Sequence, residues 1–222
     1  MKIISYIIII VSLFSFCLNE NNKVFEGVIS FDLSYTDIDE KVLMQTICAL
    51  SGDSVSSYHN SKGDLQLSYC KGEIVSTSWF DSGENKLYFH PESMDTLFFY
   101  SSSISDFNAY IEKTNEFENI LEYKCQKFIV TLIPRSGRVN DTIRYEYFIA
   151  KDLKIDFNTY KNFKEGGYNE LLSMMPGISL KQIFYGKFYT RTKKATRIEK
   201  RSINLNDYKT KEKLPIKELN IE

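Results

Sequence analysis

The sequence is poor in the residue types on which most catalytic and metal-binding motifs depend. It contains two histidines and four cysteines among 222 residues, and no His/Cys/Asp spacing typical of a metal site. Its many serines include no Gly-x-Ser-x-Gly motif and no base placed beside one. The net charge of -1 gives no reason to expect nucleic acid as a partner. We therefore predict a protein that is not an enzyme, needs no cofactor or metal, and does not bind nucleic acid.

Long apolar runs are also scarce, apart from one at the start of the chain. Lys2 is followed by the almost wholly apolar residues 3–16, then by Cys17 and a polar stretch. This is the layout of a secretory signal peptide, and the run is shorter than the roughly 20 residues of a membrane span. We expect residues 1–17 to be a signal peptide and residues 18–222 to form one exported domain, in the periplasm or at the outer membrane.

The end of the signal allows two interpretations. Cys17 could be lipidated, as in a bacterial lipoprotein, or cleavage could follow it. Phe16 is larger than the residue that normally precedes a lipidated cysteine, so we favour the unlipidated form.

Three cysteines remain after this segment, namely Cys48, Cys70 and Cys125. An odd number of cysteines cannot pair completely. Cys48 and Cys70 are the nearest pair in the sequence, but export alone does not bring two side chains within bonding distance. We therefore favour unbridged cysteines and leave the disulfide state open.

Proline and glycine are sparse, with 4 and 10 residues, whereas 16 Phe and 15 Tyr are present. Aromatic residues favour half-buried strands, and apolar residues alternate along much of the chain. In residues 29–35, for example, Ile29, Phe31, Leu33 and Tyr35 share one face. Turn signals recur about every ten residues, as in an antiparallel meander. The strands predicted in this way are 29–35, 42–50, 54–59, 65–70, 74–80, 86–90, 96–101, 123–133, 142–150, 178–185 and 187–202.

Few segments favour helix. Residues 105–119 are polar and weakly helical, and residues 168–175 form the best short helix, with Asn169 as a candidate cap and Pro176-Gly177 as the stop. The charged tail, residues 205–222, is expected to be solvated.

Three motifs carry a resemblance to a known family. Residues 25–29 read Phe-Glu-Gly-Val-Ile, residues 122–128 read Glu-Tyr-Lys-Cys-Gln-Lys-Phe, and residues 175–180 read Met-Pro-Gly-Ile-Ser-Leu. In this order the chain resembles an exported Bacteroidota family of largely unknown function, the GLPGLI-like proteins, which are similar to the LolA/LolB lipoprotein carriers. It departs from the family where Tyr123 lacks a preceding glycine and where Ser179 interrupts the apolar run.

The resemblance implies a mainly β fold, in which a single curved antiparallel sheet forms an open half-barrel with short helices across its mouth. It also implies an apolar cavity inside the half-barrel. We expect this cavity to hold a lipid or a lipoprotein acyl chain, and we expect the protein to be a monomer. The flexible pair Met174-Met175 suits a lid. The alternative is an envelope structural or interaction module whose interior is filled by the same side chains. The cavity candidates are Phe31, Leu33, Leu67, Trp79, Phe98, Leu171, Leu172, Met174, Met175 and Leu180.

Other polar residues have two interpretations each. His90 is expected to be an exposed loop histidine. The acidic cluster Asp37, Asp39 and Glu40 could bind calcium weakly, but a solvated turn is favoured. Basic residues between 193 and 201 are expected to be a solvated face rather than a docking site for an acidic partner.

Overall fold

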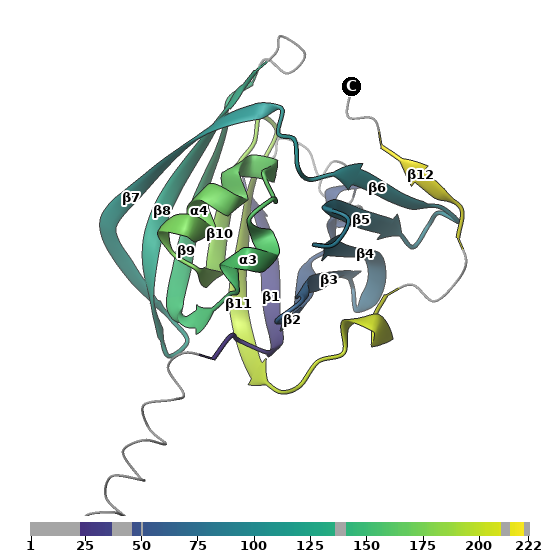
Figure 1. Cartoon of the computed structure of the whole chain (residues 1–222), viewed down its shortest axis with the longest axis horizontal. Coiled ribbons are helices and arrows are strands. Elements are labelled where there is room, and N and C mark those ends of the chain that lie inside the picture. Colours follow the sequence, from purple (N-terminus) through teal and green to yellow (C-terminus); the bar gives the residue numbers. More distant parts are fainter. Residues whose placement is uncertain (1–22, 37–45, 50, 136–140, 210–213, 220–222) are drawn as a thin grey trace, which may run out of the picture.

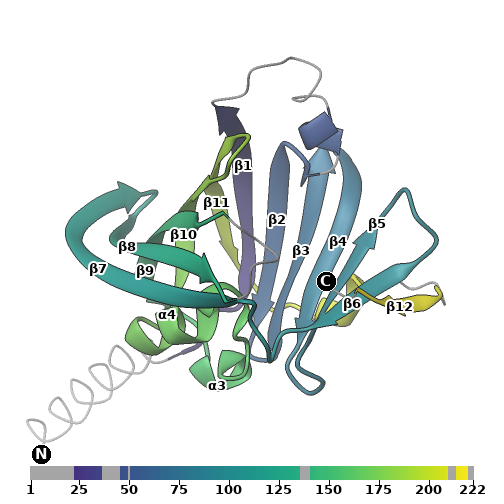
Figure 2. The ribbon, with the colours of Figure 1, turned by 90° about the horizontal axis from the view of Figure 1, so that it is seen from above.

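The computed structural model describes residues 23–36, 46–49, 51–135, 141–209 and 214–219. Twelve strands form one sheet in the order β12-β6-β5-β4-β3-β2-β1-β11-β10-β9-β8-β7. The sheet curls around the helices without closing, as Figures 1 and 2 show. The predicted mainly β fold, with a single curved open sheet and short helices, is confirmed. Neighbouring strands are antiparallel except for β12 and β6, which are parallel.

The first six strands form a meander: β1 (Gly27–Thr36), β2 (Ser54–Asn60), β3 (Gly63–Cys70), β4 (Glu73–Asp81), β5 (Lys86–Pro91) and β6 (Leu97–Ser101). The others are β7 (Phe107–Ile120), β8 (Tyr123–Pro134), β9 (Ile143–Lys154), β10 (Gly177–Tyr185), β11 (Thr190–Lys200) and β12 (Ile216–Glu218). Between β9 and β10 lie the helices α3 (Phe157–Tyr160), η2 (Glu165–Gly167) and α4 (Tyr168–Met174), and η3 (Leu205–Asp207) follows β11. The face of the sheet that packs against α3 and α4 is called the concave face here, and the opposite one the convex face.

Two predicted elements were wrong. Residues 105–119, expected to be helical, belong largely to the long strand β7, which pairs with β8. β7 is an edge strand whose side chains alternate between half-buried and exposed, and charged residues are common on such edges. Residues 42–50 were predicted as a strand, but residues 46–49 are helical, while 42–45 and 50 lie outside the described part.

The helices between β9 and β10 bring the chain back onto the sheet. Asp156 caps α3 by accepting a hydrogen bond from the backbone N–H of Asn158, 3.0 Å away. α4 was predicted, but its cap is Gly167 in the left-handed region rather than Asn169. In the described ranges, no helix has the length and apolar character needed to cross a membrane.

The C-terminal segment covers part of the convex face. Leu205 is buried with Leu65 and Trp79, and the rings of Tyr208 and Tyr58 lie 4.1 Å apart. β12 then extends the sheet at β6. The start of the tail, which was expected to be solvated, therefore contributes to a second apolar layer.

Candidate functional site

A cavity of about 240 Å³ lies on the concave face, where α3 and the residues after it approach the sheet. Its walls are mostly aromatic, and its floor is polar. The apolar and aromatic lining residues are Phe31, Phe80, Leu87, Tyr147, Tyr160, Phe163, Tyr168 and Ile178. The polar lining residues are Ser57, His59, Asp64, Gln66, Ser179, Gln182 and Lys193.

The floor is built by the alternation of β2 and β3. Residues two apart on a strand share a face, so Ser57 and His59 point the same way. The register places Ser57 opposite Gln66 and His59 opposite Asp64. These four side chains therefore form one polar group beneath the helices.

Lys193 joins this group from β11. Its Nζ donates a hydrogen bond to Oε1 of Gln66, 2.9 Å away, and lies 4.4 Å from the centroid of the Phe31 ring. Burial, reinforced by the charge of Arg191, lowers the pKa of Lys193 to about 8, although Asp64 opposes this shift. Lys193 is therefore mainly protonated at neutral pH and supplies a positive charge beside an aromatic wall.

Ser57 and His59 form a buried pair. The Oγ of Ser57 lies 2.9 Å from Nε2 of His59. Burial lowers the pKa of His59 to about 4, since the charge of Asp64 only partly offsets the cost of removing the imidazolium from water. The histidine is neutral at pH 7, so the pair offers one donor and one acceptor to a bound group.

Aromatic side chains form the roof. The ring of Tyr160 stacks on Phe80 with centroids 5.5 Å apart, and Phe163 meets Phe80 edge to face at 4.8 Å. Tyr168 contacts Tyr160 in the same edge-to-face manner. Such pairs add to the stability gained from burial, so the roof is a packed unit.

Among the predicted cavity residues, Phe31 lines this cavity. Leu171 and Leu172 are fully buried on α4, the first among residues of β8 and β9 and the second against Phe80 and Tyr160. These two leucines therefore fix the helix to the sheet.

Other candidates lie elsewhere. Leu33 and Leu180 pack in the apolar cluster around β1 and β10, Met175 packs beside Leu171, and Phe98 is half-buried in β6. Met174 is 47% exposed.

Leu67 and Trp79 lie on the convex face, under Ile203 and Leu205. The alternation of β3 and β4 is as predicted, but the apolar side of these strands faces away from α3. The side that faces the cavity carries Asp64 and Gln66, which sequence reasoning missed. The alternation along β3 could have identified them, because Asp64 and Gln66 are the polar residues between its apolar ones.

Two further expectations change. His90, predicted to be exposed, is only 6% exposed, with Nε2 2.9 Å from the carbonyl oxygen of Met94. It lies on the outer side of β5, where residues 91–95 fold over it. The basic run is divided between two faces, because Lys193 points to the concave face and Lys194 to the outside. Cys17, Asp37, Asp39 and Glu40 lie outside the described residues.

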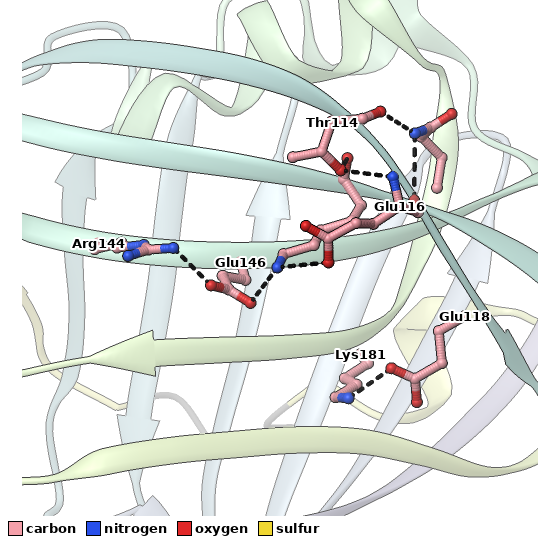
Figure 3. A network of polar contacts seen from close by, with 8 residues as sticks. Thr114, Glu116, Glu118, Arg144, Glu146 and Lys181 are labelled. Carbon is pink, nitrogen blue, oxygen red and sulfur yellow. Dashed lines mark hydrogen bonds and ion pairs between the residues drawn. The ribbon is translucent and has the colours of Figure 1, made fainter.

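A polar network occupies the outer side of β7 to β10 (Figure 3). Glu146 accepts from Arg144 at 2.8 Å and from Lys127 at 3.2 Å, and Lys127 also pairs with Glu116 at 3.1 Å. Burial alone would lower the pKa of Lys127, but the two glutamates hold it above the usual value. The acidic groups of this network are matched by cations, so it ties the bulged part of β7 to the sheet.

Glu118 makes a second connection from β7. It pairs with Lys181 at 2.6 Å and with Lys194 at 3.3 Å, as the Lys181–Glu118 contact in Figure 3 shows. These contacts join the edge strand to β10 and β11 across the outer surface.

Two larger hollows, of about 630 and 640 Å³, lie beside the C-terminal segment. Their linings include Leu214 and Lys209, respectively, which flank residues 210–213 that the structure does not describe. The concave cavity is therefore the better-defined candidate site.

Comparisons with known proteins identify no family. No protein-family model and no curated protein matches the chain. A solved structure of PNGF-II matches with a TM-score of 0.47 and 13% identity, over 88% of this chain and 31% of the PNGF-II chain. LprF from Mycobacterium bovis matches with a TM-score of 0.31 and 8% identity, over 78% of this chain and 85% of LprF. The chain thus spans about a third of PNGF-II, and its architecture is established here by its own strand order.

Proposed function

We propose that the protein is an exported, non-enzymatic binding protein that holds an acyl chain with a carboxylate head in the concave cavity. The observation that carries this proposal is the placement of the Lys193 charge on the floor of a cavity with aromatic walls. An apolar lining with a few convergent polar groups is the usual form of a small-molecule site. The acyl chain would pack against the roof, and the carboxylate would accept hydrogen bonds from Lys193 and the Ser57–His59 pair.

The titration of His59 supports binding rather than hydrolysis. A serine beside a histidine is also the beginning of a nucleophilic site. A general base works best when its pKa is near the operating pH, whereas burial lowers the pKa of His59 to about 4. Asp64 is engaged by the hydroxyl of Tyr160. The three groups are therefore better suited to hold a polar head than to activate Ser57.

The rival function is an envelope interaction module with a filled interior. The cavity volume of about 240 Å³ is below the roughly 300–1,000 Å³ usual for ligand pockets. A short or partly inserted chain would match this size better than a whole phospholipid. The two functions differ in whether the purified protein binds an acyl chain at all.

The test is displacement of a fluorescent fatty-acid probe, with native mass spectrometry of protein from its own host. Trp79 lies on the convex face, so its fluorescence is a poor reporter of the cavity. We expect saturable probe binding that Leu87→Trp weakens at least about ten-fold, because an indole would occupy the cavity. Leu219→Trp, at an exposed leucine near the C-terminus, is the matched control and should bind normally.

Absence of both probe binding and co-purified lipid would overturn the proposal and favour the interaction module. Membership of the GLPGLI-like family and the fate of Cys17 stay predictions. The N-terminal mass of the mature protein distinguishes lipidation of Cys17 from simple cleavage.

A further inference from the structure

Two of the three cysteines after the N-terminal segment meet at one end of the sheet. Cys48 lies in the helical residues 46–49, and Cys70 is the last residue of β3. Their Sγ atoms are 2.6 Å apart, and both side chains are half-buried. We propose that Cys48 and Cys70 form a structural disulfide in the exported protein. This inference goes beyond the proposed ligand and shares with it only the premise of export.

The backbone around the pair is fixed on both sides. The N–H of Gly52 donates to the carbonyl of Cys48 at 2.8 Å, and the N–H of Asp53 donates to the carbonyl of Tyr69 at 2.6 Å. The Asp53 carboxylate accepts from the N–H of Lys71 at 2.7 Å. These bonds hold the segment that carries Cys48 against the end of β3.

Gly52 is required for this approach. Its φ is +86°, in the region that favours glycine, and a Cβ at this position would overlap the carbonyl oxygen of Tyr69. The two segments therefore approach closely because of the backbone conformation at Gly52, and not only because of the two sulfurs.

A metal site is the main competitor, since the Asp53 carboxylate and the two sulfurs lie within 4.8 Å of one another. Two thiolates on a tetrahedral zinc ion with Zn–S of about 2.3 Å are about 3.8 Å apart. The observed separation of 2.6 Å is too short for an ion between them. Among the described residues the group has three members and no histidine. The geometry fits direct bonding of the sulfurs better.

The pair also differs from a reactive redox site. Catalytic cysteines have lowered pKa values, whereas the hydrogen bond between the two thiols, aided by burial, raises the pKa of Cys48 to about 11. A thiol of this kind exchanges slowly, as expected for a structural bridge.

The bridge forms by thiol–disulfide exchange with an oxidised disulfide, supplied by an export-compartment dithiol oxidase or by oxidised glutathione in the laboratory. One cysteine thiolate attacks a sulfur of the oxidant and releases one thiol. The second thiolate then displaces the remaining thiol from the mixed disulfide. Two electrons pass to the oxidant, and the two protons lost by the cysteines appear on the released thiols.

Cys125 is the third cysteine after the N-terminal segment, and it is not part of the proposed bridge. It is fully buried between β7 and β9, and burial raises its pKa to about 11. It lies in the cluster around β1 and β10, so it has no role in the bridge and should stay a free thiol.

The test is alkylation of the full chain, isolated from its own host, in denaturant with and without prior reduction. The modification is measured on separate peptides, so that Cys17 does not enter the result. We expect Cys125 to be labelled without reduction, and Cys48 and Cys70 only after reduction. In Cys48→Ser, Cys70 should be labelled without reduction. Reduction should also lower the denaturant midpoint of the wild type but not that of Cys48→Ser, while Cys125→Ser should respond like the wild type.

Labelling of Cys48 and Cys70 in the unreduced host protein would overturn the inference. Zinc retained through purification, with both cysteines labelled after chelation, would overturn it in favour of the metal site. Fatty-acid probe binding on the same sample reports separately on the proposed function, so failure of one proposal is distinguishable from failure of the other.

Discussion

The hydroxyl of Tyr160 in α3 donates a hydrogen bond to Oδ1 of Asp64 in β3, 2.5 Å away and 96 residues apart in the sequence. Burial and the charge of Asp64 raise the pKa of Tyr160 well above its usual value, so the phenol stays protonated and can donate. This bond joins the roof of the cavity to its floor. It also orients a carboxylate that lies beside His59.

Tyr160→Phe should lower the free energy of unfolding by about 2 kcal/mol, since hydrogen bonds to charged groups are worth roughly 1.5–3 kcal/mol. The substitution keeps the ring that stacks on Phe80. Urea denaturation measures the effect, with Tyr110→Phe as the control because Tyr110 is 61% exposed. Equal loss in both variants would show that the Asp64 contact does not hold the roof.

Gly167→Ala should destabilise the protein by about 3 kcal/mol. Gly167 precedes α4 with a φ of +70°, and an added Cβ would overlap the Cβ of Ala109 in β7. The cost combines about 1–2 kcal/mol for the left-handed backbone with that of overpacking.

Gly72→Ala is the matched control, because its φ is +87° and no atom lies within 4 Å of the added Cβ. It should cost only the backbone part, about 1 kcal/mol. Thermal and urea unfolding of both variants measures the difference, and equal costs would mean that α4 can shift away from β7 without penalty.

Much of the sheet was predictable from alternation and turns. The predicted strands 65–70 and 74–80 correspond to β3 and β4 within two residues at each end. β7 was not predictable in this way, because the side chains on its outer side face water and include charged residues such as Glu116 and Glu118. Its strand conformation depends on pairing with β8 in a hairpin closed by residues 121–122, and the propensity of the β7 residues alone does not report that pairing.

The site was less predictable for a different reason. Alternation shows that the two faces of a strand differ, but it does not show which parts of the chain cover each face. Both faces of β3 are covered, one by Ile203 and Leu205 and the other by α3. The apolar face was assigned to the cavity, whereas the polar face with Asp64 and Gln66 lines it. A buried polar face of this kind needs partners from distant strands, such as Lys193.

His59 should make stability depend on pH in a defined window. Its pKa is about 6.5 in an unfolded chain and about 4 in the fold. The unfolded state therefore binds more protons between these values, so the contribution is complete above about pH 6.5 and is lost as the pH falls towards 4. At about 1.4 kcal/mol per pKa unit, the loss approaches 3 kcal/mol. Asp64 and Lys193 are the charged groups that act on this histidine.

The measurement is the unfolding free energy of wild type and His59→Gln between pH 7.5 and 4.5. The two proteins share their other titrating groups, so the difference between the two curves isolates the contribution of His59. The subtraction is needed because burial raises the pKa of Glu165, and that group changes stability with the opposite sign. Parallel curves for wild type and His59→Gln would contradict the assignment.

Lys193 should make binding of an acidic ligand depend on pH. The pKa of the free protein's Lys193 is about 8, so its charge is largely lost at pH 9. Affinity for a fatty-acid probe should fall by up to about ten-fold between pH 7 and 9, and the alcohol of equal chain length should show no such change. A bound carboxylate would raise the pKa of Lys193, which moves the midpoint of the fall above 8.

Lys193→Met, which keeps the apolar stem, should bind the acid and the alcohol alike at every pH. Lys194→Met is the matched control, since Lys194 is the next residue on the strand, with a side chain that is 51% exposed on the outer face. Displacement titrations at pH 7, 8 and 9 measure all four combinations of variant and ligand. If Lys194→Met removed the pH dependence while Lys193→Met retained it, the carboxylate would be bound outside the cavity, because Lys193 lines the cavity and Lys194 lies on the outer face.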